Sequence, residues 1–539
     1  MREFSKRLLS VCGSLMMLSF LTAALPAYAE EEAPAAATEA AAPADTAAPA
    51  DTAAEDDNTF IVDGIGYRYL ESGDDVAVSR IDETLTEAKI PGTVKGKKVT
   101  RVDEGAFSQC AELKKVTLPD TITEIAAGAF YYCIALEEVN LPDSVTDIGI
   151  YAFANCYALR ELKLPPHIKS IPDYAFYYNI GLEEIVIPDE VTSIGTQSFV
   201  YCYSLRKLHI PASVTDIADM AIVSCMGLET FDLDPGNWTY KVNEDGVLLS
   251  ADGTRLIAYP VGVEKESYTV PDGVKSIAPY AFSGALRLKQ ITLPDSVKEI
   301  GDGTFSDCQA LETVTVPQQI TAIPTCLFAG CVSLQSFTIP QSVTSIAESA
   351  FYGCEKLTEM VIPDSVTEIR AWAFYGCNGL PGMRIPDSVT EIGEYALGFT
   401  IANTGDEAST ESAVQSGFLL EGGPDSAAKK YAEENGVAFK QNGLSRTALL
   451  GIVGGALALL LVIVLVLLRK NGKKDAAGAE TAGAETEEPV SDPNYTSILE
   501  EDDSEDPYDR SYGLLTEDED DETEAEPEDS EDPLPEDAE

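Results

Sequence analysis

The hydrophobic pattern of this chain repeats every 23 residues over most of its length. Each unit reads approximately IPDSVTEIGxxAFxxCxxLxxVx and begins near a proline. Because apolar residues recur at the same offsets, every unit contributes the same side chains to one continuous core, which a lone short unit could not bury. The prolines are Pro119, Pro142, Pro165, Pro188 and Pro211, then Pro271, Pro294, Pro317, Pro340, Pro363 and Pro386.

Three apolar offsets are the most regular: an isoleucine six residues after the proline, an aromatic residue eleven after it and a leucine seventeen after it. We expect these side chains to form three rungs inside a stack of coils. The aromatic rung contains Phe130, Phe153, Phe176, Phe199, Phe282, Phe305, Phe328, Phe351 and Phe374, with Ile222 and Leu397 in the remaining slots.

The segment LxxVxIP alternates apolar and polar residues, which is typical of a half-buried strand. The proline closes the strand, where the loss of a backbone N–H costs least. The Ala-Phe-x-x-Cys segment has room only for a short helical turn. Stacked copies therefore predict a mainly-β solenoid of roughly eleven coils, with one parallel sheet whose strands lie about 4.8 Å apart.

The units resemble the BspA-like class of leucine-rich repeat, which is found in bacterial surface proteins. The phrases IPDSVTEIG, LPDSVTDIG and AFYGC are highly specific to that class, and the resemblance covers about residues 59–441. It implies a leucine-rich-repeat solenoid that is capped at both ends. The implied parts are an N-terminal cap at 59–90, repeats at 91–397 with a hairpin insertion at 234–270, and a C-terminal cap at 398–441.

Two stretches carry the implied insertion and closing cap. GVLLSADGTRLIAY, residues 246–259, resembles the family's hairpin, with an Asp252-Gly253 turn between two strands. GGPDSAAKKYAEENGVAF resembles the closing cap, in which Asp425 or Ser426 would cap a short helix that ends at Gly436.

The N-terminus reads as a secretory signal peptide, residues 1–29. A basic start precedes the apolar stretch 8–24, and Ala27-Tyr28-Ala29 suits cleavage before Glu30. The alternative is an uncleaved membrane anchor, but the small residues at the cleavage site and the acidic segment after it favour removal. Residues 30–58 consist mainly of Ala, Pro, Thr, Glu and Asp and predict a disordered spacer.

A second apolar segment, residues 448–468, contains no charged residue and is long enough for one transmembrane helix. Arg469, Lys470, Lys473 and Lys474 follow it directly, so the C-terminal tail 469–539 is expected in the cytosol and the N-terminal ectodomain outside the cell. The tail is acidic and predicts disorder. The expected localisation is the cell membrane, with a single pass.

The chain carries a formal net charge of −55, with 36 Lys and Arg against 91 Asp and Glu. The acidic excess lies on both sides of the predicted span. No basic groove can form, so nucleic acid and anionic lipid head groups are unsuitable partners.

Nine of the 11 cysteines share one offset, fourteen residues after a proline or nine before the next one. A secreted chain invites a disulfide interpretation, but Asn179 and Ala285 fill the same slot, and stacked side chains that point one way suit disulfide geometry badly. We therefore favour free, buried thiols that act as small hydrophobic groups. Cys326 lies off this ladder and is expected nearer the surface. The spacings lack the CxxC pairs of zinc sites.

The sequence contains no recognisable catalytic set. His167 and His209 are the only histidines and read as solvated surface residues, and no HExxH, GxSxG, P-loop or GxGxxG motif stands in a suitable context. The recurring Asp of IPDS reads as a turn residue. We therefore predict no enzyme, no cofactor and no metal site.

Tyrosines crowd the first coils around the cysteine offset and make these units differ from the others. Tyrosine offers a large rigid contact area with a polar tip, which suits recognition, although rings at a coil edge can also serve only packing. The resemblance implies binding or adhesion to an extracellular protein or glycan, on host or matrix proteins or other cells. The alternative is a structural or sensory envelope protein whose acidic tail recruits a cytosolic partner. The predicted binding surface comprises Tyr131, Tyr132, Tyr157, Tyr177, Tyr178, Tyr201 and Tyr203.

Overall fold

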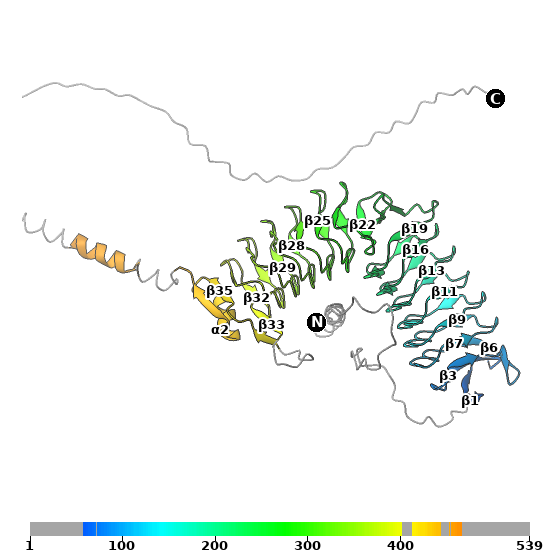
Figure 1. The fold of residues 1–539 in the computed structure, drawn as a ribbon. Helices are drawn as coiled ribbons and strands as arrows, with labels where there is room; N and C mark the ends of the chain where they lie inside the picture. The colour runs from blue at the N-terminus through cyan, green and yellow to red at the C-terminus, as the bar shows by residue number, and fades with distance from the viewer. Residues whose placement is uncertain (1–57, 72, 402–411, 444–451, 453, 466–539) are drawn as a thin grey trace, which may run out of the picture. The chain divides into compact units, whose positions relative to one another are not determined.

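The computed structural model describes residues 58–71, 73–401, 412–443, 452 and 454–465. The repeats form a mainly-β leucine-rich-repeat solenoid of about 15 turns rather than the roughly eleven expected. Counting prolines gives too few turns. The strands of the caps and of the inserted hairpin pair with strands of the regular coils and so add turns of their own. Successive coils stack in chain order (Figure 1).

The first column of strands comes from the predicted LxxVxIP segment. Its strands pair in parallel with a register of one repeat, as in Glu161↔Glu184, and the middle residue of each three-residue strand faces the core. The strands are β4 (Glu87–Lys89), β7 (Lys115–Thr117), β9 (Glu138–Asn140), β11 (Glu161–Lys163), β13 (Glu184–Val186), β16 (Lys207–Ile210), β19 (Thr230–Leu233), β23 (Ser267–Thr269), β25 (Gln290–Thr292), β27 (Thr313–Thr315), β31 (Gly382–Arg384), β35 (Leu419–Gly422) and β36 (Ala438–Gln441).

A second column of parallel strands contradicts the prediction of one sheet. The isoleucine rung itself pairs between coils, for example Ile125 with Ile148. These strands are β6 (Lys97–Val102), β8 (Glu124–Ile125), β10 (Asp147–Ile148), β12 (Ser170–Ile171), β14 (Ser193–Ile194), β17 (Asp216–Ile217), β22 (Arg255–Ala258), β24 (Ser276–Ile277), β26 (Glu299–Ile300), β28 (Ala322–Ile323), β29 (Ser345–Ile346), β30 (Glu368–Ile369) and β32 (Glu391–Ile392).

The Ala-Phe-x-x-Cys segment forms hydrogen-bonded turns, and the described residues 58–401 contain no α-helix. The expected helical turns are therefore wrong. The reason is that alternate N–H groups leave the local turn and donate to the next coil, as Phe130 N does to Ala152 O at 2.8 Å. In one place these bonds extend to a short parallel pair, β15 (Phe199–Val200) with β18 (Ile222–Val223).

The IPDSV segment is a turn that ties neighbouring coils together. In the unit that starts at Pro363, the N–H of Val366 donates to the proline carbonyl at 3.1 Å. The hydroxyl of Ser365 donates at 2.6 Å to the carbonyl of Val343 in the preceding coil. The recurrence of Ser in this motif follows from the second bond, which needs a side-chain hydroxyl.

The aromatic rung is the central part of the core. Neighbouring rings stack, with centroids 4.8 Å apart for Phe107 and Phe130 and 4.9 Å apart for Phe351 and Phe374. All nine predicted phenylalanines are buried.

The nine ladder cysteines are free and buried, as favoured from the sequence. Eight of them donate their thiol to the carbonyl of the aromatic-rung residue one coil earlier, as Cys133 does to Phe107 O at 2.9 Å. Asn179 makes the same bond with its amide, to Phe153 O at 3.0 Å. The slot therefore favours a small donor, which explains how Asn179 can replace cysteine there, although Ala285 fills the slot without a donor. Cys326 is 2% exposed, so the expectation that it lies nearer the surface is wrong.

The inserted residues form an antiparallel meander of β20 (Tyr240–Val242), β21 (Leu248–Ser250) and β22. The turn between β21 and β22 contains Asp252, whose carboxylate accepts hydrogen bonds from Ser250 Oγ at 2.7 Å and Thr254 N at 2.9 Å. These bonds lower the pKa of Asp252 to about 2. The hairpin separates two core clusters: Leu248 belongs to the N-terminal one and Leu249 to the C-terminal one.

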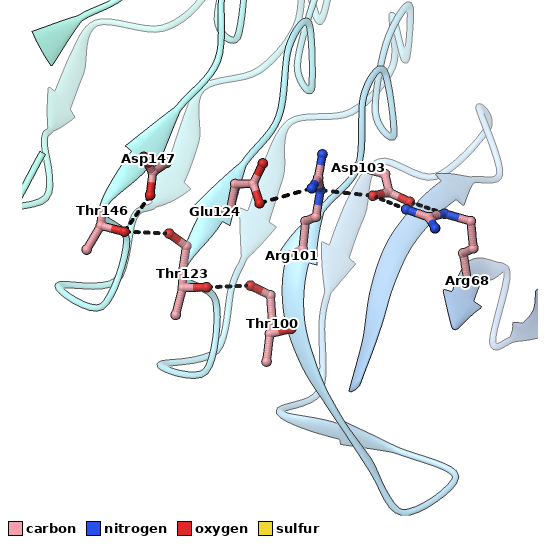
Figure 2. Close-up of polar contacts among 8 residues, drawn as sticks. All are labelled: Arg68, Thr100, Arg101, Asp103, Thr123, Glu124, Thr146 and Asp147. Atoms are coloured by element: carbon pink, nitrogen blue, oxygen red, sulfur yellow. Dashed lines mark hydrogen bonds and ion pairs between the residues drawn. The ribbon is translucent and has the colours of Figure 1, made fainter. Parts of the chain in front are cut away.

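The first coils are covered by β1 (Thr59–Val62), β2 (Ile65–Tyr69) and β3 (Asp75–Ile81), which pair antiparallel before β3 joins β6 in parallel. A two-residue strand, β5 (Thr93–Val94), pairs with β6. Figure 2 shows the polar network that ties β2 to the coils: Arg68 donates two hydrogen bonds to Asp103, at 2.8 and 2.9 Å, and Arg101 bridges Asp103 to Glu124. Beside it, threonine hydroxyls donate to backbone carbonyls of the preceding coil.

At the other end, α2 (Ala427–Asn435) closes the core. Ser426 is its N-cap, and the left-handed Gly436 ends it, as expected. Tyr431 fixes the helix to the last coil, because its hydroxyl donates to Leu397 O and accepts from Leu397 N. A short antiparallel pair, β33 (Phe399–Ile401) with β34 (Ser412–Val414), lies in the same region of the sequence.

The predicted signal peptide (1–29), most of the spacer (30–58) and the tail (469–539) lie outside the described residues. Of the predicted span 448–468, only 452 and 454–465 are described, and these are helical. Within the described part of the chain, no helix combines the length and hydropathy that a membrane crossing requires.

Candidate functional site

Each coil has two backbone positions with positive φ, on either side of the buried aromatic rung. The second of them directly precedes the cysteine slot, and its N–H donates to the next coil, as Tyr178 N does to Val200 O at 2.9 Å. Later coils place Gly330, Gly353 and Gly376 at this position, which is the residue that a left-handed conformation favours.

The early coils place tyrosines at this glycine position instead. Tyr132, Tyr178 and Tyr201 each have a φ of 61°. A non-glycine residue in the left-handed region costs about 1–2 kcal/mol. Strained residues of this kind cluster at functional sites, where the strain is retained for another purpose.

The tyrosine rings join into one connected surface, which we call the tyrosine layer. Tyr151 and Tyr174 stack with centroids 4.4 Å apart, and Tyr178 and Tyr201 lie 4.5 Å apart. Edge contacts link these pairs to the other members. The layer contains Tyr131, Tyr132, Tyr151, Tyr157, Tyr174, Tyr177, Tyr178, Tyr201 and Tyr203.

The structure brings all seven predicted tyrosines into this layer, but it does not expose them equally. Tyr132 is 37% exposed, Tyr201 is 3% exposed, and the other five are partly buried. Sequence reasoning missed Tyr151 and Tyr174, which occupy the first positive-φ position. Their fixed distance of nine residues from the proline was the signal that could have found them.

Burial raises the pKa of seven phenol groups of the layer and keeps them protonated at neutral pH: those of Tyr131, Tyr151, Tyr157, Tyr177, Tyr178, Tyr201 and Tyr203. Burial raises the pKa of Tyr157 to about 12. Burial and neighbouring phenols also raise the pKa values of Tyr151, Tyr177 and Tyr178. The layer therefore offers apolar rings with neutral hydroxyls that can donate or accept hydrogen bonds.

Two hydroxyls at the C-terminal end of the layer are buried without a hydrogen-bond partner among the described residues: Tyr201 Oη and Tyr203 Oη. An unsatisfied buried polar group costs about 1–3 kcal/mol. They pack beside Val200, Val223 and Tyr280 in a small cluster of their own. Tyr280 was also missed, because the inserted hairpin separates it from the other tyrosines in the sequence.

Both histidines lie on the surface in cross-coil pairs, His167 with Glu190 and His209 with Asp232, each at 3.1 Å. No group of His, Cys, Asp and Glu suited to a metal ion occurs among the described residues. The tyrosine layer is therefore the feature of the described chain that best suits recognition.

The strain at Tyr132 predicts a reversal between two substitutions. At this left-handed position, Tyr132→Gly should be more stable than Tyr132→Ala by about 1 kcal/mol, because both lose the ring and only alanine retains the strain. At Tyr131, where φ is not positive, the alanine variant should be more stable than the glycine variant by roughly 0.5–1 kcal/mol. Chemical denaturation of the four variants measures both differences. The same order at both sites would contradict the assigned backbone conformation.

Comparison with known proteins gives a family match. The family described as "BspA type Leucine rich repeat region" matches residues 100–229, 263–380 and 321–404. No curated protein matches the chain significantly.

Solved structures also resemble it. A leucine rich cell surface protein from Faecalibacterium prausnitzii is 29% identical, with a TM-score of 0.50, covering 68% of this chain and 100% of that one. A leucine-rich repeat protein from Eubacterium ventriosum is 22% identical (TM-score 0.45; 62% and 92% covered). The pneumococcal vaccine antigen PcpA is 21% identical (TM-score 0.43; 72% and 99% covered).

Proposed function

Because the chain belongs to the BspA-type leucine-rich repeat family of bacterial cell-surface proteins, we propose that it binds an extracellular macromolecule, and that it does so through the tyrosine layer. The observation that carries this proposal is the retention of tyrosine at positions where the backbone favours glycine. Backbone pairing between coils gives no reason for that choice, since Gly330 N and Gly353 N in the later coils make the same cross-coil hydrogen bond, at 2.8 and 2.7 Å. The proposed activity is reversible recognition without catalysis.

We further propose that the protein is held at the cell surface by the apolar segment 448–468. Large apolar side chains of its described helical part are exposed, including Leu457 at 64% and Leu461 at 64%. Exposed contiguous apolar surface is rare in water and suits a lipid environment. The basic residues after Leu468 support an outward solenoid and an inward tail.

This topology predicts the result of protease shaving. Treatment of intact cells should destroy the solenoid and spare the tail 469–539, because the tail lies behind the membrane. Antibodies against each part, applied to blots of treated cells, measure the outcome. A tail that is lost together with the solenoid would overturn the orientation.

Binding is tested by applying purified residues 59–441 to arrays of matrix proteins, mucins and glycans. Both ends of this region carry caps, so its core is closed. The double variant Tyr177→Ser and Tyr178→Ser should weaken a hit at least about tenfold, because it removes two rings from the centre of the layer. The matched control is Tyr352→Ser with Tyr375→Ser, a stacked pair with centroids 5.1 Å apart in later coils.

The outcomes separate the alternatives. A hit that both double variants leave unchanged would keep binding but exclude the tyrosine layer. The absence of any hit, together with a cytosolic protein captured by the tail, would favour the sensory alternative.

A further inference from the structure

The outward side of the first strand column changes its chemistry after the inserted hairpin. In these strands the middle residue is buried, and the residues before and after it face outward. In β7, β9, β11, β13, β16 and β19, at least one of the two outward residues is charged. Some of these charges pair between coils, as Lys115 does with Glu138 and Lys207 with Asp232.

Four successive coils after the hairpin carry no charge at these outward positions. β23, β25 and β27 pair in register, and a bridge from Thr313 to Ser336 adds the segment 336–338 as the fourth coil. β25 marks this part of the solenoid in Figure 1. Charge returns in the next two coils, with Glu359 and Arg384. We call the uncharged set the hydroxyl face: Ser267, Thr269, Gln290, Thr292, Thr313, Thr315, Ser336 and Thr338.

The side chains of the hydroxyl face are free to bind a ligand. Thr292 is half-buried and the other seven residues are exposed. Among the described residues, none of the eight side chains takes part in a hydrogen bond within the chain. On the second column, by contrast, threonine hydroxyls are used internally, as in the bond from Thr344 to Thr321 O at 3.2 Å.

Strand propensity alone does not explain this face. Threonine suits any strand of the column because its side chain is β-branched. The earlier strands nevertheless carry glutamate and lysine at the same two positions and pair in the same register. The absence of charge from four consecutive coils is therefore a property of the surface rather than a requirement of the fold.

The chemistry of the face matches a neutral sugar polymer. A hydroxyl group both donates and accepts hydrogen bonds, and so do the hydroxyls of a sugar. Stacked coils repeat these groups about every 4.8 Å along the solenoid, which suits a ligand with repeating units. A protein partner would need aromatic or other apolar anchors, and the apolar residues of these strands point inward. The net charge of −55 disfavours an acidic polymer.

We propose that the hydroxyl face binds a neutral linear polysaccharide, whose successive sugar units form hydrogen bonds with successive coils. Each such bond contributes little by itself, so binding depends on several coils acting together. This site does not rest on the proposed function, because the residues of the tyrosine layer all lie in coils before the hairpin.

The test uses isothermal titration of the full-length chain with hexasaccharides of equal length. The neutral probes are cellohexaose, mannohexaose and xylohexaose, and the acidic probe is hexagalacturonate. At least one neutral probe should bind, and hexagalacturonate should not. The double variant Thr292→Val and Thr315→Val should weaken the binding at least about tenfold, because valine keeps the branched shape and removes two hydroxyls from the centre of the face. Its melting temperature should equal that of the parent, since these hydroxyls have no partner in the chain.

Thr117→Val is the matched control, because Thr117 is the third residue of β7 and occupies the same register position in an early coil. It should change the dissociation constant less than about twofold, as should Tyr177→Ser with Tyr178→Ser. A parent chain that binds none of the neutral probes would overturn the proposal, and so would equal losses for the control and the double variant.

The arrays of matrix proteins separate this site from the tyrosine layer. A protein hit that weakens with Tyr177→Ser and Tyr178→Ser, in a chain that ignores the neutral probes, would refute the polysaccharide site and keep the proposed function. A protein hit that weakens with Thr292→Val and Thr315→Val, again without sugar binding, would assign the hydroxyl face to a protein partner and overturn this inference.

Discussion

Replacing Phe176 by alanine should lower the free energy of unfolding by about 3–5 kcal/mol, as large-to-small changes in a packed core do. The ring is 1% exposed and stacks between Phe153 and Phe199, with centroids 6.0 and 5.4 Å apart. Its loss opens a cavity that neighbouring coils cannot fill, because each coil is fixed to the next by backbone hydrogen bonds. Chemical denaturation followed by circular dichroism measures the change.

Glu183 provides the control for this prediction. Its side chain points outward and pairs with Arg160 at 2.6 Å in an exposed ion pair. Such pairs contribute little, so Glu183→Ala should cost under about 0.5 kcal/mol. Equal costs at Phe176 and Glu183 would mean that the inside and outside of the coil are assigned wrongly.

The second large effect is a pH-dependent gain in stability on replacing Asp307 by asparagine. In the unfolded chain an aspartate titrates near its ordinary pKa of about 3.9, whereas burial raises the pKa of Asp307 in the folded chain to about 7. Between about pH 4 and pH 7 the folded chain holds the extra proton, so this residue makes the parent progressively less stable as the pH rises. Asparagine cannot ionise, so the variant does not lose stability in this way as the pH rises.

The difference between Asp307→Asn and the parent should therefore be small at pH 4 and should reach about 1–3 kcal/mol in favour of the variant at pH 8. Thermal and chemical denaturation at several pH values measure it. Other carboxylates contribute equally to both proteins and cancel. Asp364→Asn, which removes an exposed carboxylate in a turn of a later coil, is the matched control for the loss of one charge. A difference for Asp307→Asn that is flat across this range would refute the burial of its charge.

The regular part of the fold was predictable because identical offsets require identical environments. The aromatic rung from Phe130 to Phe374 followed directly from the repeat, as did the free cysteines beside it. Tyr259 was missed, although it extends the rung by stacking on Phe282 at 5.0 Å. The inserted hairpin displaces it from the periodic count, so only three-dimensional pairing reveals its place.

The second column of strands was not predictable for a different reason. Its regular members, such as β8 and β10, are two residues long, too short to show an alternating pattern. Their hydrogen bonds form between coils and depend on the stacking distance rather than on the local sequence.

The candidate site was only half visible in the sequence. The crowding of tyrosines was apparent, but their left-handed backbone conformation was not. The signal was that tyrosine in the early coils and glycine in the later coils occupy the same offset. The packing of Tyr280 against Val200 and Val223 could not be inferred, because it depends on how the coils on the two sides of the insertion stack.

The inserted hairpin also gives the solenoid a boundary between two cooperative blocks. Leu248 packs with the N-terminal core and Leu249 with the C-terminal core, so β21 belongs to both but joins them only through its two opposite faces. In a repeat protein each coil depends on its neighbours, and unfolding that starts at one end spreads from coil to coil. A strand with one face on each core is a place where this spreading can stop. A chain cleaved among its first coils would then lose the tyrosine layer and keep a folded C-terminal block.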